Sequence, residues 1–380
     1  MRIVIAAGGT GGHLYPAVAL AREFQRVVPG AHILFVGTPR GLEAKVLARE
    51  GFELRMITAK PFMGGGPLKA ATSLLALPLG IWQCVRLLRR SHADLVIGIG
   101  GYTSPPALLA AGLLCLPRVI VEPNAFPGMA NRVLGSFVQR VFVAFEAAGR
   151  YFPPSTVRVV GTPIRREFYE DAGTGPGARG EGPPSTSRLL IFGGSQGARA
   201  INTAMIEALP HLMATPSIRE HVAVIHQTGE SDLARVKAAY EAAGLPAEVV
   251  PFLYDMPRVL RSAALVVSRA GAVTVAELAA CGKPAILVPL PHAIYQHQEH
   301  NARVMEAAGA AVVLLQPELT GARLAETIAA LLGDPDRLRG MGAQSRTLGR
   351  TDAASAIARD CCALVGACDE TTQSPGAARA

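Results

Sequence analysis

Short apolar runs alternate with longer amphipathic stretches along most of the chain. Strands of a parallel sheet are buried on both faces and appear as continuous apolar runs, whereas helices repeat every 3.6 residues. The apolar runs predict strands at residues 2–7, 32–37, 95–100, 118–123, 140–145, 188–194, 222–227, 265–269 and 285–290. Strands that alternate with helices in this way indicate βαβ units, and so an α/β fold with parallel sheets.

The rhythm of strand and helix is interrupted by a segment rich in Gly, Pro and Ser at residues 171–187. The two halves on either side open alike, with a strand followed by GGTGG or by GGSQG. A chain of 380 residues is long enough for two domains. We therefore expect two Rossmann-like domains facing each other across a cleft. The expected ranges are a first domain at 1–165, a linker at 166–187, a second domain at 188–365 and a disordered tail at 366–380.

Composition narrows the class of protein. Half of the residues are apolar, which excludes wholesale disorder and supplies a large core. The six cysteines have no paired metal-ligand spacing, and the chain enters a strand at once, so we expect no targeting peptide and reduced, cytoplasmic thiols.

Charge is distributed unevenly between the two halves. Residues 1–162 contain 17 Lys and Arg against 7 Asp and Glu, whereas the remainder contains 20 against 22. One half therefore carries all the excess positive charge, which indicates an anionic partner such as nucleic acid, a membrane surface or a phosphorylated ligand.

The basic half includes an apolar segment at residues 67–90 with two interpretations. Only 16 residues separate Lys69 from Arg86, and Pro78 and Gln83 interrupt them, so this stretch is shorter than the ~20 apolar residues that cross a bilayer. Trp82 and the arginines that follow it favour partial insertion beside anionic headgroups. The alternative is an ordinary core helix with a solvated basic end.

The first glycine loop, GGTGGH at 8–13, fits neither GxGxxG nor the P-loop pattern. Its glycines allow close approach to a ligand, and amides at the start of the next helix are available to an anion. His13 would then lie beside that anion. The alternative is a tight strand–helix turn with His13 as a cap or surface residue.

Further loops follow other predicted strands, where ligands bind in open α/β sheets. GIGGYTSPP at 98–106 is one, and VEPNAFPG at 121–128 places Glu122 and Asn124 at a strand end. In the second half, SRAGAVTVAE at 268–277 combines Arg269, a helix start whose amides at 272–276 suit a phosphate, and Glu277 within reach of a hydroxylated ligand. Turn chemistry and a solvated helix residue are the competing explanations.

Two acidic or imidazole-rich segments raise the question of a metal. His297 and His300 flank Glu299, but no fourth ligand is evident, and a loop that binds hydroxyl groups fits as well. Asp334 and Asp336 mimic the Asp-x-Asp signature of metal-dependent sugar transferases, yet they follow a helix and flank a proline, which is typical of a helix-to-helix turn. We expect no metal and no other cofactor.

Taken in order, several motifs match one family. They are GGTGGH (8–13), GGYTSPP (100–106), VEPN (121–124), GTPIR (161–165), GGSQGAR (193–199), the stretch from Arg269 to Glu277, and HQ…NA (297–302). The chain resembles the MurG family of lipid-linked N-acetylglucosaminyltransferases, which has the GT-B architecture of glycosyltransferase family 28. The resemblance implies metal-free transfer of GlcNAc from UDP-GlcNAc to the 4-hydroxyl of MurNAc in lipid I, with inversion, to give lipid II in peptidoglycan synthesis.

The resemblance also implies roles for individual residues. His13 is the candidate base, because the pKa of an unperturbed histidine lies near ~6.5, and Glu122 is the other candidate. The implied donor-binding residues are Thr10, Gly11, Gly12, Asn124, Arg165, Ser195, Leu253, Arg269, Ala272, Val273, Thr274, Val275, Ala276, Glu277 and Gln298. Among them, Arg165 would lie near the hinge, Glu277 would take the ribose hydroxyls and Gln298 those of GlcNAc.

The implied partners are the donor UDP-GlcNAc, the acceptor lipid I, an anionic membrane surface, and cell-wall synthesis and division proteins. The protein would be peripheral, on the cytoplasmic face of the bacterial plasma membrane. Nucleic-acid binding is disfavoured because aromatic residues make up only 5% of the chain. Another GT-B enzyme that uses a UDP-sugar, either a glycolipid transferase or a UDP-GlcNAc epimerase, is the alternative. A dehydrogenase is disfavoured because no GxGxxG is followed by an acidic residue about 20 positions further along the chain.

Overall fold

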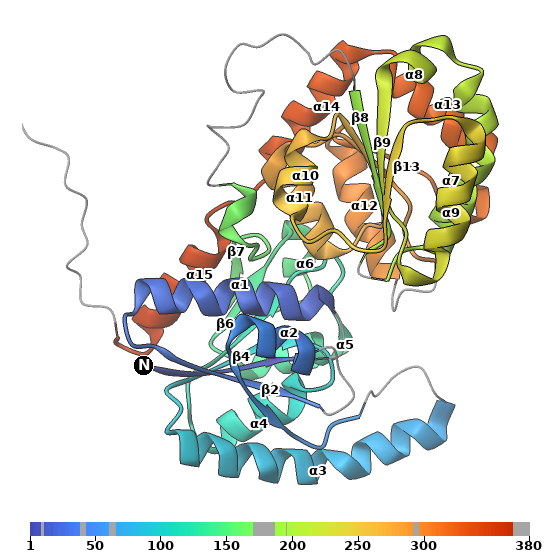
Figure 1. The fold of residues 1–380 in the computed structure, drawn as a ribbon. Coiled ribbons are helices and arrows are strands. Elements are labelled where there is room, and N and C mark those ends of the chain that lie inside the picture. The colour runs from blue at the N-terminus through green and yellow to red at the C-terminus, as the bar shows by residue number, and fades with distance from the viewer. Residues whose placement is uncertain are drawn as a thin grey trace, which may run out of the picture.

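Figure 1 shows two α/β bodies, each built around a parallel sheet. The computed structural model describes residues 1–8, 11–38, 43–60, 66–169, 187–194, 196–291 and 296–367. The tail at 368–380 and most of the Gly/Pro-rich linker lie outside these residues. The expected α/β fold with two Rossmann-like sheets is confirmed by the strand orders below.

The first sheet has the order β3-β2-β1-β4-β5-β6-β7, all parallel. The order reverses beside β1, as in the Rossmann fold. Its strands are β1 Arg2–Ala7, β2 His32–Gly37, β3 Glu53–Met56, β4 Leu95–Gly100, β5 Arg118–Glu122, β6 Arg140–Val143 and β7 Val157–Val159.

Helices cover both faces of this sheet because alternate strand residues point to opposite sides. Ile3 and Ile5 pack in one apolar cluster with α1, whereas Val4 and Ala6 pack in another with α3 and α4. The helices of this half are α1 Gly11–Val27, α2 Glu43–Glu50, α3 Gly66–Ser91, α4 Ser104–Leu113, α5 Met129–Leu134 and α6 Glu146–Gly149, with 3-10 turns η1 Gly135–Phe137 and η2 Arg166–Phe168.

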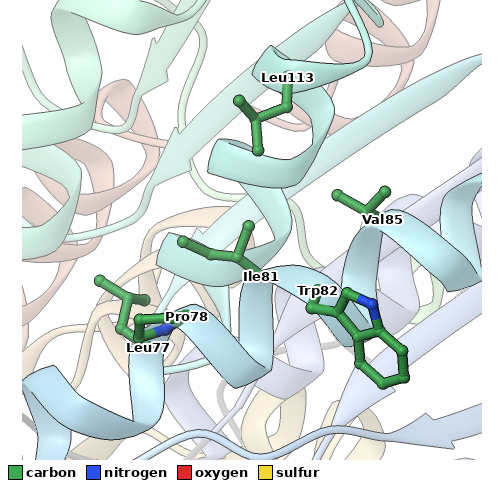
Figure 2. Close-up of a pocket in the computed structure, with 6 residues that line it drawn as sticks. All are labelled: Leu77, Pro78, Ile81, Trp82, Val85 and Leu113. Atoms are coloured by element: carbon green, nitrogen blue, oxygen red, sulfur yellow. The ribbon is translucent and has the colours of Figure 1, made fainter.

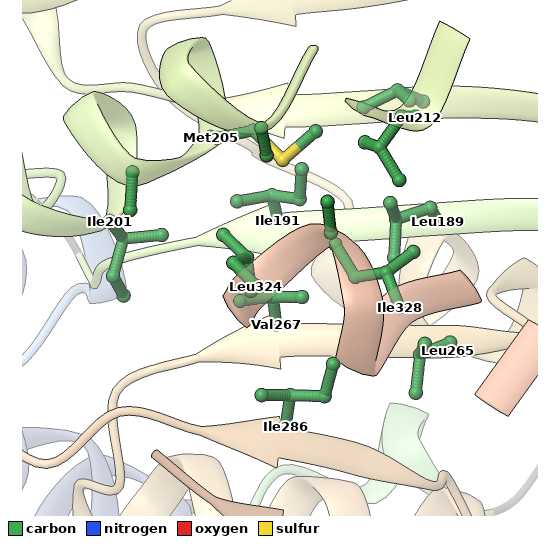
Figure 3. Packing of buried hydrophobic residues seen from close by; sticks show 14 of the residues in the cluster. Leu189, Ile191, Ile201, Met205, Leu212, Leu265, Val267, Ile286, Leu324 and Ile328 are labelled. Atoms are coloured by element: carbon green, nitrogen blue, oxygen red, sulfur yellow. The ribbon is translucent and has the colours of Figure 1, made fainter. Parts of the chain in front are cut away.

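The second sheet repeats the pattern, with the order β10-β9-β8-β11-β12-β13. Its strands are β8 Ser187–Phe192, β9 Val222–Gln227, β10 Ala247–Val250, β11 Leu265–Ser268, β12 Ala285–Leu287 and β13 Ala311–Val313. Figure 3 shows one face, where Leu189 and Ile191 of β8 meet Met205 of α7 and Leu324 of α13. Leu190 and Phe192 point into the opposite cluster.

The second half contains most of the helices and the remaining 3-10 turns. They are α7 Arg199–Met213, α8 Pro216–His221, η3 Glu230–Asp232, α9 Leu233–Ala243, α10 Met256–Ser262, α11 Ala272–Cys281, α12 His297–Ala307, η5 Gln316–Glu318, α13 Gly321–Leu332, α14 Pro335–Thr347 and α15 Ala353–Leu364.

The chain crosses between the halves twice. Ile164 at the end of the first domain and Phe168 just beyond it are buried in a cluster of the second sheet. The last helix returns, since α15 contacts α1 and buries Ile357 and Cys361 among Ile3 and Ile5 of β1. Residues 353–364, which the sequence analysis placed in the second domain, therefore pack on the first, and this corrects that part of the expected division. An apolar helical face does not specify which domain it will cover.

Candidate active site

The carboxyl ends of the central strands of both sheets meet at the boundary between the two halves. Helix α1 of the first half, which follows β1, contacts α11 of the second half, which follows β11. In Figure 1, α1 lies along the side of the first half that faces the second. Both helices therefore begin in the region between the domains, where the positive ends of their dipoles favour anions.

Two glycine loops of the first half fit against each other without room for side chains. A Cβ atom on Gly101, whose φ is +73°, would lie 2.0 Å from the Gly8 carbonyl oxygen. A Cβ on Gly100, with a φ of +106°, would lie 3.0 Å from Nε2 of His13. The GGYTSPP loop thus needs these glycines to bring β4 close to the end of β1 and to make space for the histidine.

His13 lies in the first turn of α1 and is partly buried. Burial and, to a smaller extent, the charge of nearby His297 lower the pKa of His13 to about 4, although a hydrogen bond with the Gly8 backbone opposes this shift. His297 belongs to α12 of the second half, so the two imidazoles lie near each other across the boundary between the halves. His13 is therefore neutral at pH 7 and able to accept a proton.

Glu122 at the end of β5 is buried and accepts four hydrogen bonds. Oε1 accepts from the Asn124 backbone N (3.0 Å) and from its Nδ2 (3.1 Å). Oε2 accepts from the Gly128 backbone N (3.1 Å) and from Nδ2 of Asn131 (2.8 Å). Burial raises the pKa of Glu122, and these hydrogen bonds oppose that shift. The carboxylate organises the VEPNAFPG loop around itself.

The start of α11 has amides of the kind that the anion site predicted in the second half needs, but fewer of them than expected. The helix begins at Ala272 after Gly271, so the amides of Ala272, Val273 and Thr274 have no partner within the helix. The amide of Val275 donates to the Gly271 carbonyl at 2.9 Å, and that of Ala276 belongs to the helical ladder. Donor contacts expected from these two amides are therefore not available; three amides remain.

Glu277 lies one turn further along α11 and is partly buried. Burial raises the pKa of Glu277 to about 8, while Arg165 lowers it. Among the residues that the structure describes, Glu277 has no hydrogen-bond partner. Arg165 precedes η2, where the two domains join, and its guanidinium carbon lies 5.2 Å from the Phe168 ring centroid. The structure thus brings Arg165 and Glu277 together, with Tyr15 of α1 beside both.

Two other predicted donor residues are engaged with the protein itself. The Arg269 guanidinium donates to the Val288 carbonyl (3.0 Å), the Pro289 carbonyl (3.1 Å) and Oε1 of Gln316 (2.7 Å). Oε1 of Gln298 accepts from the Leu290 backbone N at 3.0 Å, which leaves its amide nitrogen for a ligand. Both side chains therefore help to shape the loop after β12.

The other residues that were predicted to bind the donor lie in different parts of the chain. Gly11 and Gly12 form the first turn of α1, with Gly12 exposed, and Leu253 packs partly buried against a core cluster of the second half. Thr10 and Ser195 lie outside the described residues.

Metal ligands were considered at two places in the sequence. The helix-to-helix turn is confirmed, since Asp334 caps α14 by accepting from the Arg337 backbone N at 2.9 Å, and Asp336 pairs with Arg339. Within the described part of the chain, no three His, Cys, Asp or Glu side chains are grouped as metal ligands would be. That no metal is needed stays a prediction.

Three residues at the site were not singled out from the sequence. Asn131 supplies a buried donor to Glu122, Tyr15 lies beside Arg165 and Glu277, and Asn301 joins the two domains. Asn301 falls within the HQ…NA motif, but its role depends on a partner 176 residues away along the chain.

Comparison with known proteins identifies the family. Residues 3–143 match the glycosyltransferase family 28 N-terminal domain, and residues 188–357 match the C-terminal domain of the same family. A relative from Geobacter metallireducens is 44% identical over 357 residues, covering 94% of this chain and 97% of the relative. The chain belongs to glycosyltransferase family 28. That relative is named as a UDP-N-acetylglucosamine–N-acetylmuramyl-(pentapeptide) pyrophosphoryl-undecaprenol N-acetylglucosamine transferase.

Solved structures agree with the family 28 assignment. The crystal structure of Acinetobacter baumannii MurG superposes with a TM-score of 0.76 at 29% identity, covering 94% of this chain and 98% of that one. A UDP-N-acetylglucosamine 2-epimerase structure, described as putative, from Listeria monocytogenes gives a TM-score of 0.68 at 15% identity, covering 97% of each chain. The second likeness shows the shared fold alone, because one fold hosts several activities.

Proposed function

We propose that this protein transfers GlcNAc from UDP-GlcNAc to the 4-hydroxyl of MurNAc in lipid I, with inversion, and so makes lipid II for peptidoglycan. The names of its family 28 relatives support the donor and the acceptor. The observation that carries the proposal is the meeting of the α1 and α11 starts, with His13 on one side of the boundary and the Arg165–Glu277 pair on the other.

The donor is held by the second domain in this scheme. The amides of Ala272, Val273 and Thr274 receive the diphosphate at the positive end of α11. Glu277, one turn along, accepts hydrogen bonds from the ribose hydroxyls, which supply the donors that it lacks among the described residues. The amide nitrogen of Gln298 is directed to the GlcNAc hydroxyls. Hydrogen bonds to a charged acceptor are stronger than those to a neutral one, so a ligand that provides donors to Glu277 gains affinity.

The reaction is one displacement at the anomeric carbon. The oxygen of the acceptor 4-hydroxyl bonds to that carbon while the bond to the β-phosphate oxygen of UDP breaks, and UDP leaves with the electron pair. His13 takes the hydroxyl proton. The negative diphosphate raises the pKa of a neighbouring imidazole, which strengthens a base that is weak in the free protein. The α11 amides stabilise the charge on the leaving UDP.

Glu122 fits the role of base less well than His13. All four of its hydrogen bonds come from backbone or amide N–H groups of its own loop. A base must contact the acceptor hydroxyl, and this carboxylate would have to give up partners to do so. Glu122 therefore acts by holding Asn124 and the loop in place.

The acceptor is membrane-bound in this proposal, and helix α3 provides a docking surface. No helix in the described part of the chain has the length and apolar character to span a bilayer. The inner face of α3 buries Cys84 and Leu88. On its outer face, Leu75 is 79% exposed and Trp82 57%, and an ordinary core helix would cover such side chains.

Figure 2 shows a shallow apolar hollow on this surface, of about 520 Å³. It is lined by Leu77, Pro78, Ile81, Trp82 and Val85 of α3 and by Leu113 of α4. The guanidinium of Arg86 lies 5.7 Å from the Trp82 ring centroid, with Arg89 and Arg90 exposed beyond it. Apolar side chains beside arginines suit the boundary of an anionic leaflet, which is the cytoplasmic face.

Gln83, which interrupts the apolar segment, anchors the helix to the domain. Its Oε1 accepts from the Thr58 backbone N at 2.6 Å and its Nε2 donates to Oγ1 of Thr58 at 3.2 Å. Helix α3 therefore lies on the membrane surface as a fixed part of the fold, and the protein is peripheral.

The test of the reaction is UDP release from UDP-GlcNAc in EDTA, with and without a short-chain lipid I analogue. We expect release only with acceptor, and a glycosylated product of inverted configuration. Release without acceptor would favour hydrolysis or epimerase chemistry, and activity on a diacylglycerol acceptor instead would favour a glycolipid transferase. His13→Ala and Glu122→Ala are assayed alongside for turnover and for stability.

Membrane docking is tested separately by sedimentation with vesicles that contain anionic lipid. Leu75→Ala combined with Trp82→Ala should weaken binding to these vesicles, whereas Val159→Ala, an exposed apolar side chain on edge strand β7, should not. Equal binding of all three proteins would contradict the assignment of α3.

A further inference from the structure

A polar network crosses from the catalytic half to the donor half through a fully buried asparagine. Asn301 of α12 has 0% exposure. Its Oδ1 accepts from the Ala125 backbone N at 2.8 Å. Its Nδ2 faces Oδ1 of Asn124 at 3.3 Å and the Ala270 carbonyl at 3.2 Å. One side chain thus contacts the loop after β5 in the first half and the loop after β11 in its own half.

The network continues to the carboxylate at the centre of the first-half loop. Asn124 donates from its backbone N and its Nδ2 to Glu122, while its Oδ1 accepts from Asn301. Ala270 directly precedes Gly271, the residue before the three free amides of α11. The network therefore links the loop after β5 in the first half to the start of α11, where the anion would bind. Its members are Glu122, Asn124, Asn301 and Ala270.

An aromatic stack covers the edge of this network. Phe126 follows Ala125, and its ring lies 5.2 Å from that of His300 with an interplanar angle of 16°. The guanidinium of Arg132 lies 5.6 Å from the Phe126 centroid. His300 is exposed, whereas its neighbour Asn301 is buried. The stack shields the inner hydrogen bonds from water, which strengthens them.

We propose that Asn301 is a positioning residue for the transfer reaction. Its hydrogen bonds hold the Pro123–Gly128 loop against the donor domain, a contact that we call the clasp. The clasp fixes Asn124 and the His13 side of the site relative to the diphosphate site. The expected effect of Asn301 on turnover rests on the proposed function. Its role in holding the loop against the donor domain rests on the hydrogen bonds alone. Alignment across a domain boundary affects turnover, because a small displacement of the reacting groups is costly.

The primary test is Asn301→Ala, with Arg303→Ala as the matched control on the same helix. Arg303 pairs only with Glu299 and Glu306 of α12 among the described residues. We expect Asn301→Ala to lower kcat about 5- to 100-fold, the range for leaving a buried donor unpaired, with the donor Kd changed less than about 3-fold. Arg303→Ala should change neither.

Hydrogen exchange provides a readout that does not depend on the substrate. The Ala125 amide should exchange faster in Asn301→Ala than in the parent protein, and at the parent rate in Arg303→Ala. If the parent protein fails to use lipid I while this difference is present, the proposed function fails and the clasp stands. Unchanged exchange at Ala125, or parent kcat in Asn301→Ala, would overturn the clasp.

A double-mutant cycle separates positioning from simple loss of structure. If Asn301 acts through Asn124, then Asn124→Ala with Asn301→Ala should lose no more kcat than the worse single variant. Additive losses would overturn that route. Asn301→Ser, which keeps a smaller polar group, replaces Asn301→Ala in all three measurements if the alanine variant does not fold.

Discussion

Each half of the site contains a glutamate that is removed from water, fully for Glu122 and partly for Glu277, and the two carboxylates have opposite surroundings. Glu122 in the first half accepts four hydrogen bonds from its own loop. Glu277 in the second half has the nearby charge of Arg165 and, in the described chain, no donor. Burial raises the pKa of both, but to about 8 for Glu277. A carboxylate whose hydrogen bonds all come from the protein has a structural role, whereas one without such donors can accept hydrogen bonds from a ligand.

The largest expected effect is on stability at Glu122. Glu122→Ala leaves four N–H groups without their acceptor, of which that of Asn131 is buried and the others are partly buried, and each unpaired buried donor costs about 1–3 kcal/mol before relaxation. We expect a loss of about 3–5 kcal/mol in the free energy of unfolding, measured by urea denaturation. Glu277→Ala should change it by less than about 0.5 kcal/mol, since no described donor loses its partner.

Glu122→Gln sharpens the same comparison. A glutamine keeps one acceptor oxygen, but its amide group then faces either the Asn124 donors or those of Gly128 and Asn131. The variant should therefore be destabilised by about 1–3 kcal/mol. If Glu122→Gln unfolded at the same urea concentration as the parent protein and lost only turnover, Glu122 would be the catalytic base and not the residue that holds the loop in place.

The next effect is on donor binding at Glu277. If this carboxylate accepts the ribose hydroxyls, Glu277→Ala should weaken UDP-GlcNAc binding about 10- to 100-fold in calorimetric titration, because hydrogen bonds to a charged group contribute about 1.5–3 kcal/mol. Glu241→Ala, an exposed glutamate of α9, is the control and should bind as the parent does. Parent-like affinity in Glu277→Ala would mean that Glu277 is a solvated helix residue.

A smaller effect is the pH dependence of that binding. The pKa of Glu277 is about 8, so the side chain is mainly protonated at pH 7, and a ligand that donates to the carboxylate must displace this proton. Affinity should rise with pH up to about 8 and then level off. The limit is ~10-fold per pH unit, and we expect about 3-fold because the side chain is partly exposed. Calorimetry in two buffers should detect the released proton, and Glu277→Gln should release none.

The sequence predicted the interior of both sheets well and their edges poorly. The strands predicted at 2–7, 32–37, 95–100 and 222–227 coincide with β1, β2, β4 and β9. The four strands that the apolar pattern missed are β3, β7, β10 and β13, which are the edges of the two sheets. Three of these are short and contain no buried residue, with polar residues in ELRM, VRV and AEVV. Edge strands lack the continuous apolar run by which a parallel strand is recognised.

The same limit applies to the site. Glycine loops, strand ends and the start of α11 are local features, so His13, Glu122 and Glu277 could be proposed from their neighbours along the chain. The difference between the two glutamates could not, because it depends on whether side chains such as Asn131 fold back onto the carboxylate. The clasp at Asn301 and the return of α15 to the first half depend on contacts between distant segments and left no local pattern.

The smallest expected effect is on the pKa of His13, the proposed base that takes the proton of the acceptor hydroxyl. After burial, the charge of His297 is the next cause that lowers the pKa of His13. His297→Ala should therefore raise the pKa of His13, by less than about one pH unit, and move the acidic limb of the kcat/KM profile to higher pH by the same amount. His211→Ala, an exposed histidine of α7, should leave the limb in place. An acidic limb that is unchanged in His297→Ala but disappears in Glu122→Gln would make the first-half glutamate the base, and the contrast between the two carboxylates would then be one between catalysis and binding.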